Sequence, residues 1–156
     1  MRIMKAQPLT TEAFAPYGDV LVIPTVNGRY DADAALASTR PSARPSLGLS
    51  QRDPVSPPLR VTQMERHRFS SQTFLPLAPV RFLVLVAPHG ADGPDMEQAQ
   101  AFLAGPGQGI TYGADVWHHP MAVLDTPARF ATLIWRDGSA DDEQFVDVQP
   151  FTLELG

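Results

Sequence analysis

Glycine and proline interrupt this chain so often that no long helix fits between them. The 156 residues include 11 glycines and 16 prolines, and both residue types disrupt the interior of a helix. The apolar stretches between them are short, as in Val20–Ile23 and Val80–Ala87, which suits strands joined by tight turns. We therefore predict an all-β fold with one or two short helices, arranged as a sandwich or a closed barrel.

Strand signals recur along the whole chain. The expected strands are Val20–Ile23, Leu47–Ser50, Leu59–Met64, Phe74–Leu77, Val80–Ala87, Ile110–Tyr112, Met121–Leu124, Arg129–Trp135 and Phe145–Leu155. One short helix is predicted at Thr10–Tyr17, between a threonine cap and a proline stop. A second is predicted at Asp95–Leu103, where apolar side chains recur on one face. Gln51–Pro58 contains three prolines and is expected to be a loop.

Length and composition exclude several classes of protein. A chain of this length fits one domain, which we place at residues 1–156. The chain has no cysteine, so disulfides, thiolate metal sites and cysteine nucleophiles are excluded. A net charge of -5 argues against a nucleic-acid partner. The sequence shows no signal peptide and no apolar stretch long enough to span a membrane, so we expect a cytoplasmic protein.

A polar segment, Glu65-Arg66-His67, follows one of the predicted strands. Side chains two positions apart on a strand face the same side, so we predict that Glu65 and His67 point together while Arg66 points away. Gln72 follows His67 across an expected turn at Ser70-Ser71. It is therefore able to return to the same cavity on the next strand.

A second polar segment contains two adjacent histidines, His118 and His119, followed by Pro120. Adjacent residues of an extended segment face opposite sides, so only one of the two imidazoles is expected to enter a given cavity. The proline biases His119 toward extended geometry. We predict a polar site built around Glu65, His67 and His118.

Such a set of side chains supports two kinds of chemistry. Imidazole nitrogens and side-chain oxygens bind divalent ions, and the same groups form acid–base pairs because imidazole titrates near neutral pH. The catalytic candidates are His67, His118 and Glu65. If a metal is bound, its predicted ligands are Glu65, His67, Gln72 and His118. The acidic turn Asp141–Glu143 is expected to be a solvated surface.

The spacing of the two polar segments resembles the two motifs of cupin barrels. The first cupin motif is His-x-His, four residues, then Glu, and Glu65-x-His67 followed by Gln72 occupies that pattern. The second motif begins with a glycine and ends with a late histidine, here Gly109 and His118. Glutamate and glutamine replace one histidine and the glutamate of the first motif, so this chain offers fewer imidazoles than a usual cupin site.

A closer resemblance is to the ureidoglycolate lyase family, also called ureidoglycolate hydrolase. Met64–Leu77 is similar to the family's Glu-Arg-His and Gln-x-Phe-x-Pro sequences, and Pro94–Met121 contains its Val-Trp-His-His-Pro sequence. The opening Leu9–Asp19 extends the resemblance to most of the chain. It implies a cupin-like double-stranded β-helix, or jelly-roll barrel, that forms a homodimer. The Val80–Ala87 region is the candidate edge for pairing two copies.

The resemblance also implies an activity. It predicts an enzyme, a lyase that cleaves ureidoglycolate to glyoxylate and urea in allantoin and purine breakdown, with either a divalent metal, for which the resemblance favours Ni²⁺, or a metal-free site. Either His67 or His118 would be the base, and Glu65 would orient that imidazole or share in metal binding. The candidates for binding this small-molecule substrate are Gln72, Tyr112, Trp117, Arg52 and Arg136.

One segment departs from the family. Members carry Asn-x-Gly, an arginine and Asp-Leu-Ala near residues 26–37, where this chain reads VNGRYDADAALA. If this segment closes over the substrate, the substrate can differ. Two alternatives therefore stay open: a cupin-fold protein that acts on or binds a different small carboxylic acid without lyase activity, and another metal-dependent cupin enzyme such as an isomerase or dioxygenase.

Overall fold

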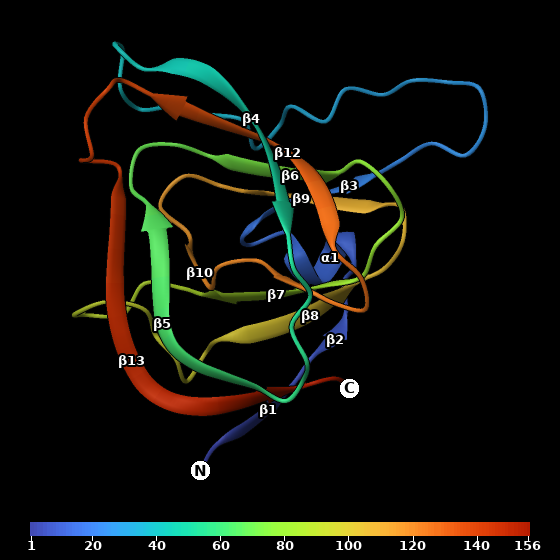
Figure 1. Cartoon of the computed structure of the whole chain (residues 1–156). Coiled ribbons are helices and arrows are strands. Elements are labelled where there is room, and N and C mark those ends of the chain that lie inside the picture. Colours follow the sequence, from blue (N-terminus) through green and yellow to red (C-terminus); the bar gives the residue numbers. More distant parts are fainter.

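The computed structural model describes residues 1–156 and consists almost entirely of strands that curl into a nearly closed barrel (Figure 1). The strands are β1 (Ile3–Lys5), β2 (Gln7–Pro8), β3 (Gly18–Val22), β4 (Arg44–Arg52), β5 (Leu59–His67), β6 (Gln72–Pro76), β7 (Phe82–Ala87), β8 (Gln100–Ala104), β9 (Gln108–Tyr112), β10 (Trp117–His118), β11 (Ala122–Val123), β12 (Ala128–Arg136) and β13 (Glu143–Glu154). The predicted all-β barrel is confirmed. The structure has no helix with the length and apolar character needed to cross a membrane.

Two sheets form the barrel. The larger has the order β1-β13-β5-β10-β7-β8-β2, with β11 also paired to β7, and the smaller has the order β3-β9-β6-β12-β4. In Figure 1, β13 curves around one side of the molecule beside β5 and ends near β1. A change of register between Asp147 and Phe151 accompanies this curve.

The core lies on both faces of the central strand β7. Phe82, Val84 and Val86 enter a cluster of 16 buried residues shared with the smaller sheet. The alternate residues of β7, Leu83 and Leu85, enter a second cluster of 12 residues on the other face. A strand buried on both faces has a continuous apolar sequence, as β7 does.

This central position corrects the predicted dimer edge at Val80–Ala87. Strand β7 pairs with β8 on one side and with β10 and β11 on the other. Its backbone groups are therefore used within the chain, and no edge remains for a second copy.

The first predicted helix is confirmed and the second is wrong. Helix α1 (Thr11–Phe14) begins at Thr10, whose Oγ1 accepts a hydrogen bond from the amide of Ala13 at 3.2 Å. At Asp95–Leu103 the chain makes only a turn and then enters β8. Pairing of β8 with β7 and with β2 outweighs the helical periodicity of these few residues.

The prediction of a loop at Gln51–Pro58 is also partly wrong. The first two residues, Gln51 and Arg52, belong to β4 and pair with Arg129 and Ala128 of β12. Strand β4 is therefore longer than the predicted Leu47–Ser50, because its register with β12 continues to the end of that strand. This extension carries Arg52 to the cavity described below.

Candidate active site

Two neighbouring strands supply the three central side chains. Glu65 and His67 lie at the end of β5, and His118 lies on β10, where it is the direct cross-strand partner of Glu65. The three side chains present ligand atoms that all lie within 4.8 Å of one another. The structure thus brings together the predicted trio and places Arg66 on the other side of β5, where it stacks on Trp117 at 4.6 Å.

His118 is held firmly in one orientation. Its ring is buried, stacks on Tyr112 with centroids 4.1 Å apart, and lies with Nδ1 3.0 Å from the carbonyl oxygen of Val116. A carbonyl oxygen only accepts, so Nδ1 carries the proton of the neutral ring. The other nitrogen, Nε2, lies 3.3 Å from Oε1 of Glu65 and has no hydrogen-bond partner.

Two of these three side chains, Glu65 and His67, reach a polar cavity of about 500 Å³, and His118 contacts Glu65 without being part of the lining. Glu65, His67 and Gln72 line the cavity, and Arg52 and Arg136 contribute cationic side chains from β4 and β12. Two of these groups have buried atoms without a hydrogen-bond partner, Oε1 of Gln72 and Nε of Arg52. Unpartnered buried polar atoms are costly, so a cavity that gathers them is suited to a polar ligand.

The two aromatic residues predicted to bind substrate, Tyr112 and Trp117, do not line this cavity. Tyr112 is buried behind His118, and burial and the nearby Glu65 raise the pKa of its phenol, which keeps it neutral. Trp117 lies in the second core cluster and donates from Nε1 to Nδ1 of His89 at 3.2 Å. Tyr112 therefore supports the imidazole from behind, and Trp117 packs on the opposite face of the sheet.

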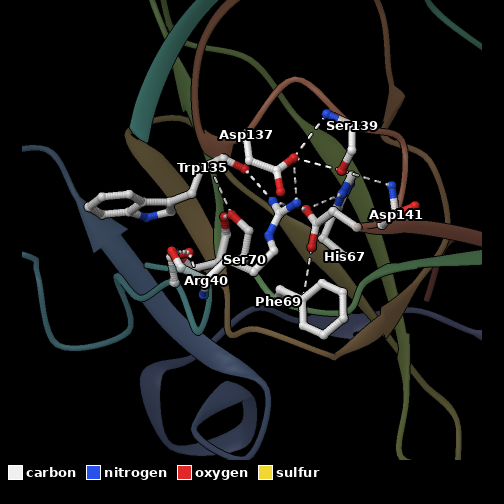
Figure 2. Close-up of polar contacts among 11 residues, drawn as sticks. Arg40, His67, Phe69, Ser70, Trp135, Asp137, Ser139 and Asp141 are labelled. Carbon is white, nitrogen blue, oxygen red and sulfur yellow. Dashed lines mark hydrogen bonds and ion pairs between the residues drawn. The ribbon is translucent and has the colours of Figure 1, made fainter. Parts of the chain in front are cut away.

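Three charged residues of the cavity were not predicted. Arg40, Asp142 and Glu143 all line it, and Figure 2 shows Arg40, Asp137 and Ser139 gathered beside His67. The expectation that Asp141–Glu143 is only a solvated surface is wrong for Asp142, which is 7% exposed. Its Oδ2 lies 3.3 Å from Nδ1 of His67.

Burial and neighbouring charges set the ionisation of these groups. Burial alone raises the pKa of Glu65, but the neighbouring imidazoles of His118 and His67 outweigh it and hold that pKa below its ordinary value. Burial and His118 lower the pKa of His67, against an opposing effect of Asp142. Burial and Glu65 raise the pKa of Glu143. At neutral pH the site therefore has an ionised Glu65 beside a neutral His67.

His119 is not part of the Glu65–His67–His118 cluster, and its Nδ1 lies 2.7 Å from the carbonyl oxygen of Pro120. Burial lowers the pKa of its ring below the ordinary value. The unfolded chain then binds a proton before the folded one as pH falls through the ordinary histidine pKa, and the free energy of unfolding decreases there by up to about 1.4 kcal/mol per pH unit.

We therefore expect His119→Gln to weaken the dependence of stability on pH. Urea unfolding of wild type and variant, followed by tryptophan fluorescence between pH 7.5 and 5.5 with EDTA present, measures this difference. Above pH 7 the two proteins should respond to pH alike. Equal slopes in the acidic range would contradict the prediction.

The donor set of the trio also fits a divalent cation. Two imidazoles and one carboxylate are ligands that first-row divalent metals accept. The unpartnered Nε2 of His118 presents a lone pair toward the Glu65 carboxylate, and two acceptors in contact at a buried position need a proton or a cation between them. Gln72, with its unpartnered Oε1, adds an oxygen donor in the same cavity.

The whole chain matches one family model, described as ureidoglycolate lyase, over residues 1–154. The chain belongs to the ureidoglycolate lyase family. It is 40% identical to a protein of Mesorhizobium japonicum named ureidoglycolate lyase, over 83% of this chain and 84% of that one. It is 37% identical to a protein of the same name from Pseudomonas aeruginosa, over 93% and 91% of the two chains.

Solved structures support the fold of this family member. A dTDP sugar isomerase from Desulfovibrio desulfuricans G20 superposes with a TM-score of 0.51 and covers 83% of this chain and 81% of its own. Sequence identity is 16%, so the likeness concerns the fold alone. The predicted cupin-like barrel agrees with the nearly closed β-structure observed here.

Proposed function

We propose that this member of the ureidoglycolate lyase family cleaves ureidoglycolate to glyoxylate and urea. The observation that carries the proposal is a cavity lined by Glu65, His67 and arginine side chains, with His118 in contact with Glu65. The substrate has a hydroxyl and a ureido nitrogen on one carbon, next to a carboxylate. Membership of the family supports the same reaction.

The reaction breaks the bond between that carbon and the ureido nitrogen. A base removes the hydroxyl proton, the oxygen's electron pair forms the carbonyl of glyoxylate, and the C–N bonding pair leaves with nitrogen. A proton delivered to this nitrogen completes urea, so the proton removed and the proton delivered balance. We assign the base to the imidazole of His67 or of His118, and general acid–base catalysis contributes about 10²–10⁴-fold to such a step.

In this proposal, the carboxylate of Glu65 interacts with both imidazoles. This carboxylate lies 3.3 Å from Nε2 of His118, and the neighbouring imidazoles hold its pKa below the ordinary value. When His118 takes a proton, Glu65 stabilises the imidazolium through the attraction of opposite charges. A divalent ion, Ni²⁺ by resemblance, would be held by Glu65, His67, Gln72 and His118, and would supply Lewis-acid polarisation of substrate oxygens.

The direct test measures urea and glyoxylate formed from ureidoglycolate by the purified chain. We expect equal amounts of the two products, assayed with and without added Ni²⁺ or Mn²⁺. Binding of the substrate without turnover under both conditions would contradict the lyase and indicate a protein that binds small acids. The test distinguishes a lyase from a binding protein because only the lyase releases urea.

Arg52 is the candidate that we favour for binding the substrate carboxylate. Its guanidinium is half-buried on the cavity wall, and its Nε has no partner, whereas Arg136 is exposed at the rim. A charged hydrogen bond contributes about 1.5–3 kcal/mol, so Arg52→Met should raise KM by roughly 10- to 100-fold. Steady-state kinetics measures this change.

Arg129→Met is the matched control for Arg52→Met. Arg129 is exposed on β12, outside the cavity, and its Nε donates to Gln51 at 3.1 Å. The Arg129→Met substitution removes the same charge from the same sheet, so the KM of this variant should equal that of wild type. An unchanged KM for Arg52→Met would move the carboxylate site to Arg136 or Arg40.

We further propose that the chain acts as a cytoplasmic homodimer that uses the outer face of the smaller sheet. Leu47 and Leu49 of the edge strand β4 are 71% and 75% exposed. They lie directly across from Leu133 and Ala131, and Ala131 in turn pairs with Leu75. A contiguous apolar patch of this kind is typical of an interface, and a two-fold axis would place the patch against its own copy.

Charge on this patch should therefore separate the two copies. We expect Leu49→Lys to sediment as a monomer in analytical ultracentrifugation, under conditions where wild type sediments as a dimer. Val26→Lys, which changes an exposed apolar residue in the segment between β3 and β4, should leave the dimer intact. A dimeric Leu49→Lys would place the interface on another surface.

A further inference from the structure

We infer that Asp142 is a positioning residue for His67: supported by Arg40, it holds the imidazole proton on Nδ1 and leaves Nε2 free for the site. The inference rests on the proposed function, in which His67 takes part in proton transfer. It adds a residue that acts through an imidazole and does not itself contact the substrate.

The contact joins two nearly buried side chains. Oδ2 of Asp142 lies 3.3 Å from Nδ1 of His67, and the two side chains are 10% and 9% exposed. The other oxygen, Oδ1, accepts the amide N–H of Phe69 at 2.7 Å. Because the backbone fixes one oxygen of the carboxylate, the second is held toward the imidazole.

Arg40 places a guanidinium beside this carboxylate. Its NH2 lies 3.8 Å from Oδ2 of Asp142 and donates to the carbonyl oxygen of Trp135 at 3.1 Å. Its NH1 lies 2.9 Å from Asp137, which also accepts hydrogen bonds from Ser139 at 2.7 and 2.9 Å. The guanidinium is therefore fixed in place (Figure 2).

The carboxylate of Asp142 selects one tautomer of His67. A carboxylate only accepts hydrogen bonds, so the neighbouring Nδ1 must be the ring nitrogen that carries the proton. Nε2 then has a free lone pair. His118 has the same arrangement, with the carbonyl oxygen of Val116 in the position of Asp142. Both imidazoles thus offer Nε2, and carboxylates or carbonyls that orient histidines in this way are common behind reactive sites.

The segment between β3 and β4 brings Arg40 to this position. It is joined to the chain after β5 by two backbone hydrogen bonds, from Thr39 to Phe69 at 2.8 Å and from Ser71 to Ala37 at 2.9 Å. This segment contains the stretch in which the sequence departs from the family pattern. Through Arg40, the segment between β3 and β4 therefore contributes a cation behind His67.

The test uses Asp142→Asn, which keeps Oδ1 for Phe69 and replaces Oδ2 with an N–H donor. An N–H facing Nδ1 favours the tautomer with the proton on Nε2. Long-range ¹⁵N–¹H correlation spectra of the full chain, labelled at histidine nitrogens, report the protonated nitrogen of each ring, and His67→Gln identifies the His67 signals. We expect protonation on Nδ1 in wild type and on Nε2 in Asp142→Asn. An unchanged tautomer would overturn the inference.

Kinetics provides the second readout. Loss of a residue that orients an imidazole should lower kcat by about 10- to 100-fold and change KM little. Asp142→Glu keeps a carboxylate and should restore the Nδ1 tautomer and part of kcat. Asp141→Asn makes the same charge change at an exposed neighbour and should behave as wild type.

The two readouts also separate this inference from the proposed function. If wild type releases no glyoxylate, the proposed function fails, while the spectra still decide whether Asp142 fixes the tautomer. If wild type is active and Asp142→Asn retains both the wild-type tautomer and kcat, the inference fails alone.

Discussion

Replacing His118 with asparagine should lower glyoxylate release by about 10²–10⁴-fold, the range that general acid–base catalysis contributes. Asparagine removes the imidazole and with it the Nε2 atom that faces Glu65 at 3.3 Å. His67→Asn should have an effect of the same order, because either ring serves as the base or stabilises the other in the same cluster. The measurement is the initial rate of glyoxylate formation at saturating substrate.

His119→Asn is the control for the His118 variant. The two residues are adjacent, but His119 lies outside the Glu65–His67–His118 cluster and its Nδ1 contacts the carbonyl oxygen of Pro120. Its activity at pH 7.5 should be close to that of wild type. Near-normal rates in both the His118 and the His67 variants would reject the assignment of the active site.

The second large effect is expected in the core below the site. Phe130 of β12 is fully buried and meets Phe82 and Phe74 edge-on, with ring centroids 5.8 and 6.4 Å apart. Phe130→Ala removes these contacts and leaves a cavity, so the free energy of unfolding should decrease by about 3–5 kcal/mol. Urea unfolding at pH 7.5 measures this loss.

Val26→Ala is the matched control for the core. Val26 is 80% exposed, so truncation there should change stability by less than about 0.5 kcal/mol. A loss below about 1 kcal/mol for Phe130→Ala would mean that the two sheets repack around the missing ring, which a tightly packed core resists.

Local alternation was enough to predict the centre of the site. Glu65 and His67 face one side of β5 and Arg66 faces the other, as the period of a strand requires. The sequence also separates His118 from His119. The resemblance to cupin motifs linked the two segments, although no local rule places β10 beside β5.

Contacts between distant segments explain the parts that were missed. Asp142 lies in a run of acidic residues that resembles any solvated turn, and only the fold brings it to His67 and Arg40. The helix expected at Asp95–Leu103 failed for the same reason, because pairing with β7 and β2 decides the conformation of β8. Sequence periodicity also could not show that β7 is central and has no free edge.

The residues that orient the two imidazoles of the site lie at very different distances from them along the chain. His118 is oriented by a carbonyl two residues before it, whereas His67 depends on an aspartate 75 positions later and on an arginine from a third segment. Local fluctuations separate remote contacts more readily than neighbouring ones. Warming should therefore break the contact that keeps the His67 proton on Nδ1, while the proton of His118 stays on its Nδ1. The enzyme would then become inactive at temperatures where the barrel is still intact.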